Sequence, residues 1–472
     1  MEERIILCNS VNERELKITL ALNGINTVGL RVMSAYDLAV KALADSGHFP
    51  EKEVIKNSEY VRIIKEVAGK EEYFKELSLN DAKNLAAAIT MMRMMSTDND
   101  NEKLKNTLIK GEFYEKNRDI LNSYLLYEDY IKGIGKTDKI NVILQAISIG
   151  IKSRYNIYVL KEFPLLPLEI KLAETLSDGL YKEICFADLF EVRETVPVID
   201  QYAEAYGIGS EIENVLKDIH DKGLPFDNVT VITGDMNVYQ EQLLYYADRY
   251  DLPMTLSDGY PVYLLNTGKV LKGIFQWDQE EYHNFNVLWN VVNSKSFNIR
   301  LLKEKVFKGI ETPGKLKDIV KLVSSLRLST NEEENKRKID RYLQATGEEE
   351  TDTIEALRRF SEELEKGYGY FAAEYAERET RISDSLSRQC ILSYFEDLQG
   401  EAFTSHHLND LLNRRIGSES FRAGFMHITS LRGAFSSIRN HNYMIGLSAD
   451  YFPGSPKENY LLLDSDLDLF DF

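Results

Sequence analysis

The sequence contains few cysteines and no long run of apolar residues. Its three cysteines, Cys8, Cys185 and Cys390, show no paired spacing, which argues against a disulfide scaffold or a cysteine zinc site and for a reducing compartment. The first ten residues hold too short an apolar stretch for a signal peptide, and no window reaches the ~18 apolar residues that a membrane span needs. We therefore expect a cytoplasmic protein that contacts no membrane.

Positive charge is also scarce. The 57 Lys and Arg residues stand against 76 Asp and Glu residues, which leaves a formal net charge of -19. Phosphate binding needs clustered cations, so this balance argues against a protein that coats nucleic acid non-specifically, although a local basic channel stays compatible with it. The chain of 472 residues is too long for one core, and its 43% apolar fraction argues against bulk disorder. We expect roughly two to four domains.

Strands alternate with helices in the first part of the chain. Short apolar runs predict strands at 4–8 and 28–33, separated by a helix-like stretch. Further strands are predicted at 156–160 and 183–186, with the helical pattern PLLPLEIKLAETL between them. Because strand, helix and strand follow each other with a short crossover, this order indicates a parallel sheet.

A second α/β part follows later in the chain. The run NVTVIT at 228–233 predicts a buried strand, which is followed by a helix at 239–250. Two more strands are predicted at 425–429 and 443–447. A Ser-x-x-Glu pattern at 210–213 predicts a capping box that opens the helix ahead of this group. These elements indicate a second α/β domain.

Two long helical stretches interrupt the α/β pattern. Both are rich in charged residues between apolar stripes, which is typical of helices with one buried face. The predicted division is a first α/β domain at 1–42 plus 145–197, a helical insertion at 43–144, a second α/β domain at 198–296 plus 419–472, and a second helical insertion at 297–418.

Three stretches resemble a known family in their order and spacing. They are YVLKEFPLLPLEIKLAETL at 158–176, the stretch 205–262 that begins AYGIGSEIENV, and GFMHITSLRGAFSSIRNHNYMIGLSADYFPGSP at 424–456. In this order they resemble the AddB and RecC-like subunits of bacterial helicase-nuclease complexes, a branch of the UvrD-like superfamily 1 helicases. The resemblance implies two RecA-like parallel-sheet domains, each with a helical insertion.

The chemistry of an ATP-driven motor is missing at its expected position. A motor of this class needs G-x-x-x-x-G-K-[ST] after its first strand, so that backbone amides and a lysine hold phosphate. Here Asn9, Ser10 and Glu13 follow the strand, without glycine or lysine. Glu162 stands where active relatives carry the acidic pair for magnesium, but Lys161 precedes it. We expect these residues, Asn9, Ser10, Glu13 and Glu162, to form a degenerate nucleotide site without bound ATP.

Contact with single-stranded DNA is implied by the same resemblance. In active relatives the strand is held by the segment after the second strand and by the late threonine turn, through hydroxyl, backbone and aromatic contacts. The matching positions are Ser34 and Tyr36 in the first domain, and Thr429, Ser430 and Arg432 in the second. Two of these residues have a simpler explanation. Ser34 is suited to capping the following helix, and an arginine such as Arg432 is common on a solvent-exposed surface without any role in binding.

Other motifs do not support a metal or catalytic site. The Gly-Lys-Thr within 133–137 lacks a strand ahead of it, so we interpret it as a loop between helices. Leu431 stands where the late helicase motif has a histidine. His406 and His407 are adjacent and face different sides of a helix, unlike a metal pair, and the alternating aspartates of 464–471 are typical of a solvated segment. We expect no metal ligands in this chain.

The leading interpretation is an ATPase-inactive helicase-like subunit, or a fragment of one, from an AddAB or RecBCD-type helicase-nuclease. It would hold single-stranded DNA or a tailed duplex and dock a motor subunit of the AddA or RecB type in double-strand break repair and recombination. One alternative is the N-terminal part of an active ATP-dependent helicase whose Mg²⁺-dependent PD-(D/E)XK exodeoxyribonuclease domain lies beyond Phe472. Another is a helicase-fold interaction scaffold without DNA binding. No activity is expected from this chain alone.

Overall fold

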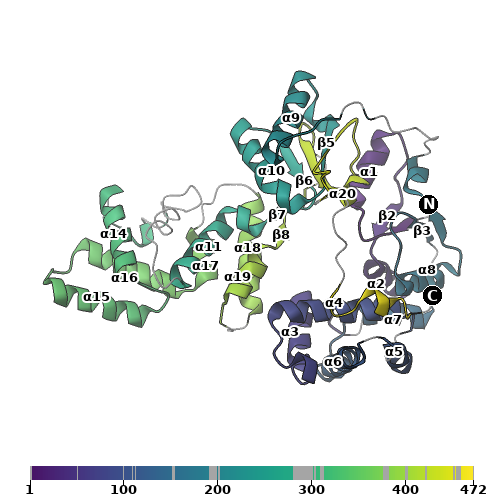
Figure 1. Cartoon of the computed structure of the whole chain (residues 1–472), viewed down its shortest axis with the longest axis horizontal. Helices are drawn as coiled ribbons and strands as arrows, with labels where there is room; N and C mark the ends of the chain where they lie inside the picture. Colours follow the sequence, from purple (N-terminus) through teal and green to yellow (C-terminus); the bar gives the residue numbers. More distant parts are fainter. Residues whose placement is uncertain are drawn as a thin grey trace. The chain divides into compact units, whose positions relative to one another are not determined.

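The structure is a computed structural model, and it divides into two compact units, Met1–Ser257 with Ser420–Phe472, and Asp258–Glu419 (Figure 1). The described residues are 3–49, 52–98, 100–108, 110–111, 113–150, 155–190, 199, 202–279, 301, 304–308, 313–375, 382–398, 402–419, 422–449, 452 and 459–470.

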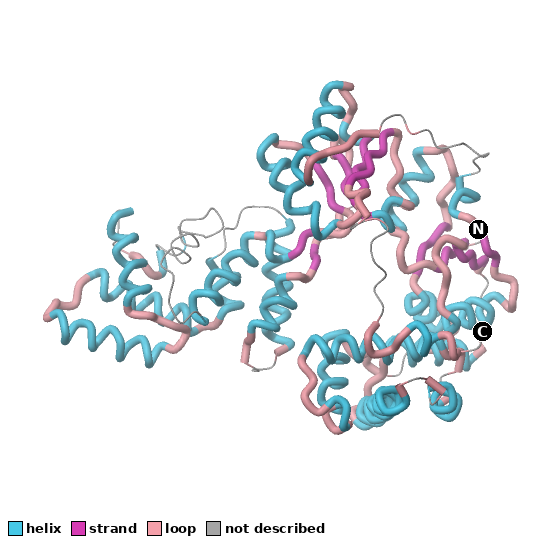
Figure 2. The backbone as a smooth tube through the Cα atoms, in the orientation of Figure 1, coloured by secondary structure: helices cyan, strands magenta, loops and turns pink. Residues whose placement is uncertain are grey.

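A parallel four-stranded sheet forms the start of the first unit. Its strands are β1 (Arg4–Leu7), β2 (Leu30–Met33), β3 (Asn156–Leu160) and β4 (Lys182–Ile184), in the order β2-β1-β3-β4. Every neighbouring pair in this sheet is parallel. The parallel sheet predicted from the sequence is therefore confirmed, and each predicted strand overlaps an observed one. The strands are drawn in magenta in Figure 2.

Helices cover both faces of this first sheet. Ile5 and Leu7 of β1 point to one face, where they pack in a core with residues of α2 (Ala35–Asp45), α7 (Lys139–Ile149) and α8 (Pro167–Ser177). Ile6 lies between them in sequence and points to the other face, because side chains alternate along a strand. There it packs with Leu16 and Leu20 of α1 (Glu13–Leu22). β1 is thus buried on both faces, as expected for a central parallel strand.

A helical block follows the first two strands. Its core contains Leu85, Ile89 and Met92 of α4 (Leu79–Met95), all fully buried. These residues repeat at spacings of three and four residues, so they form one face of the helix. We call the elements α3 to α6 the helical block: they are α3 (Asn57–Ala68), η1 (Glu72–Phe74), α4 (Leu79–Met95), α5 (Asn101–Leu108) and α6 (Tyr114–Gly133).

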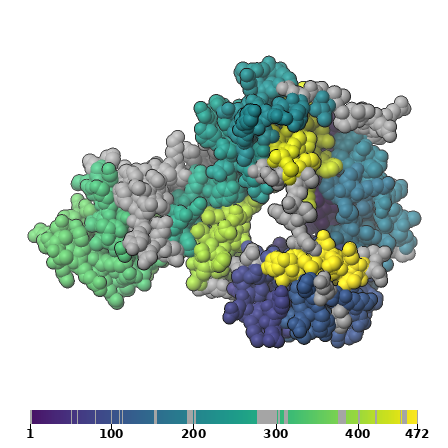
Figure 3. Space-filling view, in the orientation of Figure 1, coloured from purple at the N-terminus to yellow at the C-terminus, as the bar shows by residue number. Residues whose placement is uncertain are grey.

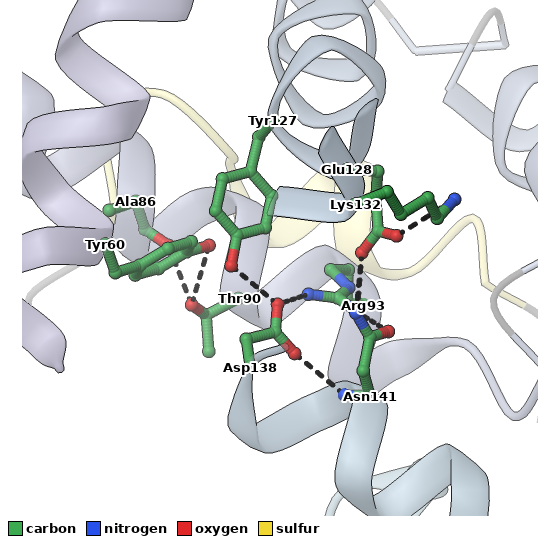
Figure 4. Close-up of polar contacts among 9 residues, drawn as sticks. All are labelled: Tyr60, Ala86, Thr90, Arg93, Tyr127, Glu128, Lys132, Asp138 and Asn141. Carbon is green, nitrogen blue, oxygen red and sulfur yellow. Dashed lines mark hydrogen bonds and ion pairs between the residues drawn. The ribbon is translucent and has the colours of Figure 1, made fainter. Parts of the chain in front are cut away.

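A buried polar cluster joins the helical block to α7 (Figure 4). The Nη1 atom of Arg93 lies 2.5 Å from Oδ2 of Asp138, and its Nη2 atom lies 2.8 Å from Oδ1 of Asn141 and 3.3 Å from Oε1 of Glu128. The hydroxyl of Tyr127 donates to the same Asp138 oxygen at 2.8 Å. Burial raises the pKa of Tyr127, and the Asp138 carboxylate raises it further. The cluster therefore fixes α4 and α6 against a helix that packs on the first sheet.

A second parallel sheet belongs to the same unit. Its strands are β5 (Val229–Thr233), β6 (Met254–Leu256), β9 (Met426–Ser430) and β10 (His441–Ile445), in the order β10-β5-β9-β6. All three strand pairs are parallel. The other elements of this part are α9 (Ile208–Asp221), η3 (Phe226–Asn228), α10 (Met236–Tyr250), α20 (Leu431–Ala434) and, near the end of the chain, α21 (Asp464–Leu467).

The capping box predicted at 210–213 is wrong, because α9 already begins at Ile208. The N-cap is Gly207, whose φ of 91° is a conformation that favours glycine. In the stretch 424–456 that carries part of the family resemblance, Pro453 and Gly454 lie outside the described residues.

The second unit is built almost wholly from helices. Its strands β7 (Tyr260–Pro261) and β8 (Arg415–Ile416) form a short antiparallel pair. Phe275, Phe360 and Phe371 lie in its buried core. Among the helices that the structure describes, none is long and apolar enough to cross a membrane. The remaining elements of this unit are η4 (Val262–Leu264), α11 (Asn266–Gln279), α14 (Pro313–Ser325), α15 (Glu332–Thr346), α16 (Asp352–Glu365), α17 (Tyr368–Tyr375), α18 (Ile382–Asp397) and α19 (Ser405–Leu412).

Candidate functional site

The strand order of the first sheet defines where a ligand would bind. β1 pairs with β2 on one side and with β3 on the other, so the chain changes direction across the sheet between β2 and β3. In open parallel sheets, ligands bind outside the carboxyl ends of the strands at such a switch point. Asn9 and Ser10 follow β1 here, and Glu162 follows β3. The structure thus brings these predicted residues to one edge of the sheet.

Hydrogen bonds within the chain occupy the carboxylates at this edge. Nδ2 of Asn9 donates to Oε1 of Glu169 at 3.0 Å, and the second oxygen of Glu169 accepts from the amide of Leu166 at 2.9 Å, at the start of α8. Both oxygens of Glu162 accept from the amide of Phe186, at 2.9 and 3.0 Å. The carboxylate of Glu162 therefore holds the chain that follows β4.

The start of α1 is also occupied from within the chain. In a nucleotide site, the free amides of this helix turn would receive a phosphate. Here the side chain of Asn12 accepts from two of them. One oxygen of Glu13 lies 2.6 Å from Nζ of Lys17, and the other accepts from the amide of Val32 at 3.0 Å. Burial alone would raise the pKa of Glu13, but the Lys17 and Val32 contacts lower it below its ordinary value, so the side chain stays charged.

Aromatic side chains pack beside these carboxylates. The ring of Phe435 lies 4.9 Å from that of Phe163 and 5.7 Å from that of Phe186, which begins η2 (Phe186–Phe190). Next to Phe435, the carbonyl oxygen of Ser436 accepts from the buried hydroxyl of Thr19 in α1 at 2.8 Å. The connection after α20 thus contacts both α1 and the carboxyl edge of the first sheet. The Glu13, Glu162 and Glu169 carboxylates and the aromatic rings at this edge do not neutralise a phosphate, although the exposed Lys161 lies between β3 and Glu162.

The predicted DNA contacts of the first domain lie where β2 ends. Ser34 caps α2: its hydroxyl accepts from the amide of Asp37 at 3.1 Å and donates to the Asp37 carboxylate at 2.6 Å. Tyr36 is half-buried, and the ammonium of Lys139 lies 5.6 Å from its ring centroid. The sequence does not predict this contact, because Lys139 is far from Tyr36 in the chain. The helix-capping explanation of Ser34 is confirmed, and the surface next to it is a tyrosine ring with a cation.

The predicted contacts of the second domain lie where β9 ends. Thr429 is buried and accepts a hydrogen bond from the hydroxyl of Ser257 at 2.9 Å. Ser430 is the N-cap of α20, and its hydroxyl accepts from the amide of Gly433. Arg432 is exposed. Of these three predicted residues, the guanidinium of Arg432 is the group that faces solvent.

These two sets of predicted residues lie on separate sheets. Among the described residues, no hydrogen bond, ion pair or ring contact joins Ser34 or Tyr36 to Ser430 or Arg432. A ligand that touches both sets would have to span the carboxyl ends of two sheets.

β9 contains a buried histidine, His427, which was not predicted as a functional residue. Nδ1 of His427 lies 2.8 Å from the hydroxyl of Thr255 in the neighbouring strand, while its Nε2 is buried without a partner in the described structure. Burial, and to a smaller extent the nearby charge of Arg439, lower the pKa of His427 to about 3. The imidazole is therefore neutral at physiological pH. The apolar residues on both sides of it in β9 were a signal for this burial.

Glu211 makes a second contact that was not predicted from the sequence, at the carboxyl end of the second sheet. Oε1 of Glu211 accepts from the amide of Gly446 at 2.8 Å, and the hydroxyl of Tyr239 donates to Oε2 at 2.5 Å. A Cβ at Gly234 would lie 2.2 Å from the carbonyl oxygen of Gly446. Such close backbone approach is possible with glycine, which has no side chain. The turn after β10 is thus held from α9 and α10.

The other motifs do not form a reactive site. Lys136 of the Gly-Lys-Thr sequence lies in the loop between α6 and α7, and its Nζ is 2.9 Å from Oε1 of Glu59 in α3. The predicted inter-helix loop is therefore confirmed. Nδ1 of His407 accepts from the amide of Thr404 at 3.2 Å and so caps α19. Within the described ranges, no group of three His, Cys, Asp or Glu side chains is arranged to hold a metal ion.

Comparison with known proteins adds no relative. No family model matches the chain, and no curated protein matches it. The fold and the contacts at the strand ends are therefore the basis for a functional proposal.

Proposed function

We propose that this chain is a helicase-like protein without ATPase activity, of the AddB or RecC type, which holds single-stranded or tailed DNA and docks a motor subunit in double-strand break repair. In this proposal the two parallel sheets are RecA-like domains. The chain contributes a surface for the DNA strand, and the motor subunit contributes ATP hydrolysis.

The order of elements supports this proposal. The helical block stands between β2 and β3 of the first sheet, and the unit Asp258–Glu419 stands between β6 and β9 of the second. Two parallel sheets, each interrupted by helices, is the arrangement that the family resemblance implies. Fold alone does not determine function, so the contacts at the strand ends carry the mechanistic part of the proposal.

The polar groups at the switch point of the first sheet are hydrogen-bonded within the chain, and this observation supports the proposed absence of ATPase activity. Glu162 and Glu169 accept hydrogen bonds from backbone amides of the chain itself, and Asn12 caps the helix that would face a phosphate. A triphosphate at this edge would meet these carboxylates and that of Glu13. Like charges this close in a partly buried place are strongly unfavourable. Nucleotide binding would therefore need these hydrogen bonds to break.

The groups at the ends of β2 and β9 are suited to a DNA strand. The face of an aromatic ring stacks on any base, and a cation beside it contacts the phosphate. Tyr36 with Lys139 offers both groups at the first sheet, and Arg432 offers a cation at the second. This small number of cations agrees with the net charge of -19, which disfavours non-specific coating.

A fluorescence anisotropy titration of a tailed duplex at low salt tests the DNA-holding role. The expected effect of Tyr36→Ala is about tenfold weaker binding, because one stacked base contributes roughly 1–3 kcal/mol. Lys139→Ala and Arg432→Ala should each lower the slope of the logarithm of the binding constant against the logarithm of the salt concentration by about 1, the amount expected for one lost phosphate contact.

Lys41 and Tyr155 provide a matched control. The ammonium of Lys41 lies 4.7 Å from the ring centroid of Tyr155, so the pair has the same chemistry as Lys139 and Tyr36. Tyr155 directly precedes β3, at the opposite edge of the same sheet. Lys41→Ala should leave DNA binding unchanged. If the natural chain does not bind DNA at low salt, even together with the motor subunit, the DNA-holding role is wrong.

A further inference from the structure

The segment after the second sheet returns to the helical block. We call residues 459–470 the tail. In Figure 3 the tail, in yellow, lies across the surface of the helical block. Its contacts begin at α4, where the hydroxyl of Tyr460 donates to Oδ1 of Asp81 at 2.7 Å and Nδ2 of Asn459 donates to the carbonyl oxygen of Asn84 at 3.3 Å. The tail is thus bound along a surface that is remote from it in the sequence.

Apolar side chains anchor the tail in the core of the helical block. Leu461, Leu462 and Phe470 are buried in the same cluster as Ile89 and Met92, and Leu467 packs against it. Burial of each such side chain removes apolar surface from water, which is favourable. The tail also forms one short helical turn, α21, which places Leu467 near the other anchors. These contacts resemble an amphipathic segment bound by its apolar face.

A built carboxylate site accompanies these anchors. The side chain of Asp466 is almost wholly buried, and its oxygens lie 2.9 Å from Nδ2 of Asn117 and 3.4 Å from Nζ of Lys116. Oδ2 also accepts from the amide of Leu463 at 3.2 Å. A Cβ at Gly111 would lie 2.5 Å from Oδ1 of Asp466, so the site has room for the carboxylate because this position is glycine. A buried lysine with an amide and a glycine is a specific receptor for one carboxylate.

We propose that the helical block carries a peptide-binding surface for acidic amphipathic segments, and that the tail is its occupant. The recognised pattern is a pair of apolar residues, an aspartate four residues after the second of them, and a phenylalanine four residues further on. The buried Lys116 and Asn117 select the aspartate, and the apolar core selects the leucines and the phenylalanine. This inference does not depend on DNA binding or on the absence of ATPase activity.

The bound tail connects two parts of the first unit, the second sheet and the helical block. The tail follows β10 of the second sheet along the chain and binds the block that stands between β2 and β3 of the first sheet. When the tail is seated, it restricts the second sheet relative to the block. A peptide with the same pattern would compete with the tail and release this restraint.

A labelled peptide with the sequence of residues 459–470 tests the proposal in the full-length chain. In the variant Leu462→Ala with Phe470→Ala, the chain's own tail competes poorly, so the peptide should bind at least tenfold more tightly than it binds the natural chain. Replacing the aspartate of the peptide by alanine should weaken binding at least tenfold. Equal binding to the natural chain and to the tail variant would overturn the proposal.

Glycine substitutions provide a matched pair of controls. Gly111→Ala in the tail variant should abolish peptide binding, whereas Gly133→Ala should leave it unchanged, because a Cβ at Gly133 would meet no atom within 4 Å. Hydrogen exchange in the natural chain gives a readout that needs no added peptide. The amides of Leu467 and Phe470, which are hydrogen-bonded within the tail, should be protected and should exchange faster after Gly111→Ala. Unprotected tail amides in the natural chain would contradict the proposal.

Discussion

Arg93 and Asp138 form a buried ion pair that joins α4 to α7, with Nη1 2.5 Å from Oδ2. Arg93 is fully buried, so removal of Asp138 leaves its guanidinium with only one carboxylate partner among the ion pairs described, Glu128 at 3.3 Å, in a place that water does not reach. The pair belongs to the cluster that attaches the helical block to the helices of the first sheet. Its energetic role can be measured by removing one partner at a time.

The variant Asp138→Ala should lower the free energy of unfolding by about 3–5 kcal/mol, because breaking a buried pair costs far more than breaking a surface pair. Urea unfolding followed by circular dichroism measures this change. The matched control is Glu174→Ala, which breaks an exposed pair with Lys171 and should cost about 1 kcal/mol or less. Equal losses in the two variants would show that the Arg93 pair does not stabilise the fold.

The stability of the second sheet should depend on pH through His427. Its pKa is about 3 in the folded chain, against an ordinary value of 6.5, so the unfolded chain takes up the proton first. The stability that this residue contributes is present above pH 6.5 and is lost as the pH falls from 6.5 towards 3, by up to about 1.4 kcal/mol per pH unit.

The variant His427→Gln separates this effect from the titration of carboxylates, which both proteins share. Between pH 7.5 and 5, the free energy of unfolding should fall more steeply for the natural chain than for the variant. The test is a set of urea titrations of both proteins at several pH values. Parallel pH profiles would mean that His427 is not buried in its neutral form.

Gly433 should be essential for the turn after β9. A Cβ at this position would lie 2.2 Å from Oγ1 of Thr429, so Gly433→Ala should cost about 1–3 kcal/mol through overpacking. Thr429→Ala removes the clashing hydroxyl, and the double variant should therefore recover part of the loss. A double-mutant cycle of unfolding free energies measures this coupling. Strictly additive losses would contradict the close contact.

Lys136 should have no role in nucleotide binding. Its ammonium pairs with Glu59 in a loop between helices, and the hydrogen bond from Lys136 to that carboxylate raises the pKa of the lysine. Lys136→Ala should leave calorimetric titrations with Mg²⁺ and ATP unchanged and should cost about 1 kcal/mol or less in stability. ATP turnover by the natural chain that disappears in Lys136→Ala would reverse the assignment of this loop.

The parallel sheets are the part of the fold that the sequence predicts best. Short apolar runs locate β1, β3 and β5 within a residue or two, because strands buried on both faces read as continuous apolar segments. The order β10-β5-β9-β6 was not predicted. It depends on which strands pair across long stretches of chain, and local patterns do not record such pairings.

The candidate site is less predictable than the sheets. The sequence predicts the residues at the carboxyl ends of the strands, such as Asn9 and Glu162, because ligand positions follow from strand order. It does not predict the contact of Lys139 with Tyr36 or the burial of Thr429, since both depend on the packing of separate elements. The capping box at 210–213 failed because the backbone of Gly207 starts the helix earlier.

The central claim is that the chain holds DNA without the use of ATP, and one measurement tests it most directly. Anisotropy of a labelled tailed duplex should be followed at low salt with and without Mg²⁺ and ATP, while phosphate release is recorded in the same sample. The account predicts salt-dependent binding that ATP does not change, without phosphate release. Phosphate release by the purified chain, or no DNA binding even in the presence of the motor subunit, would contradict it.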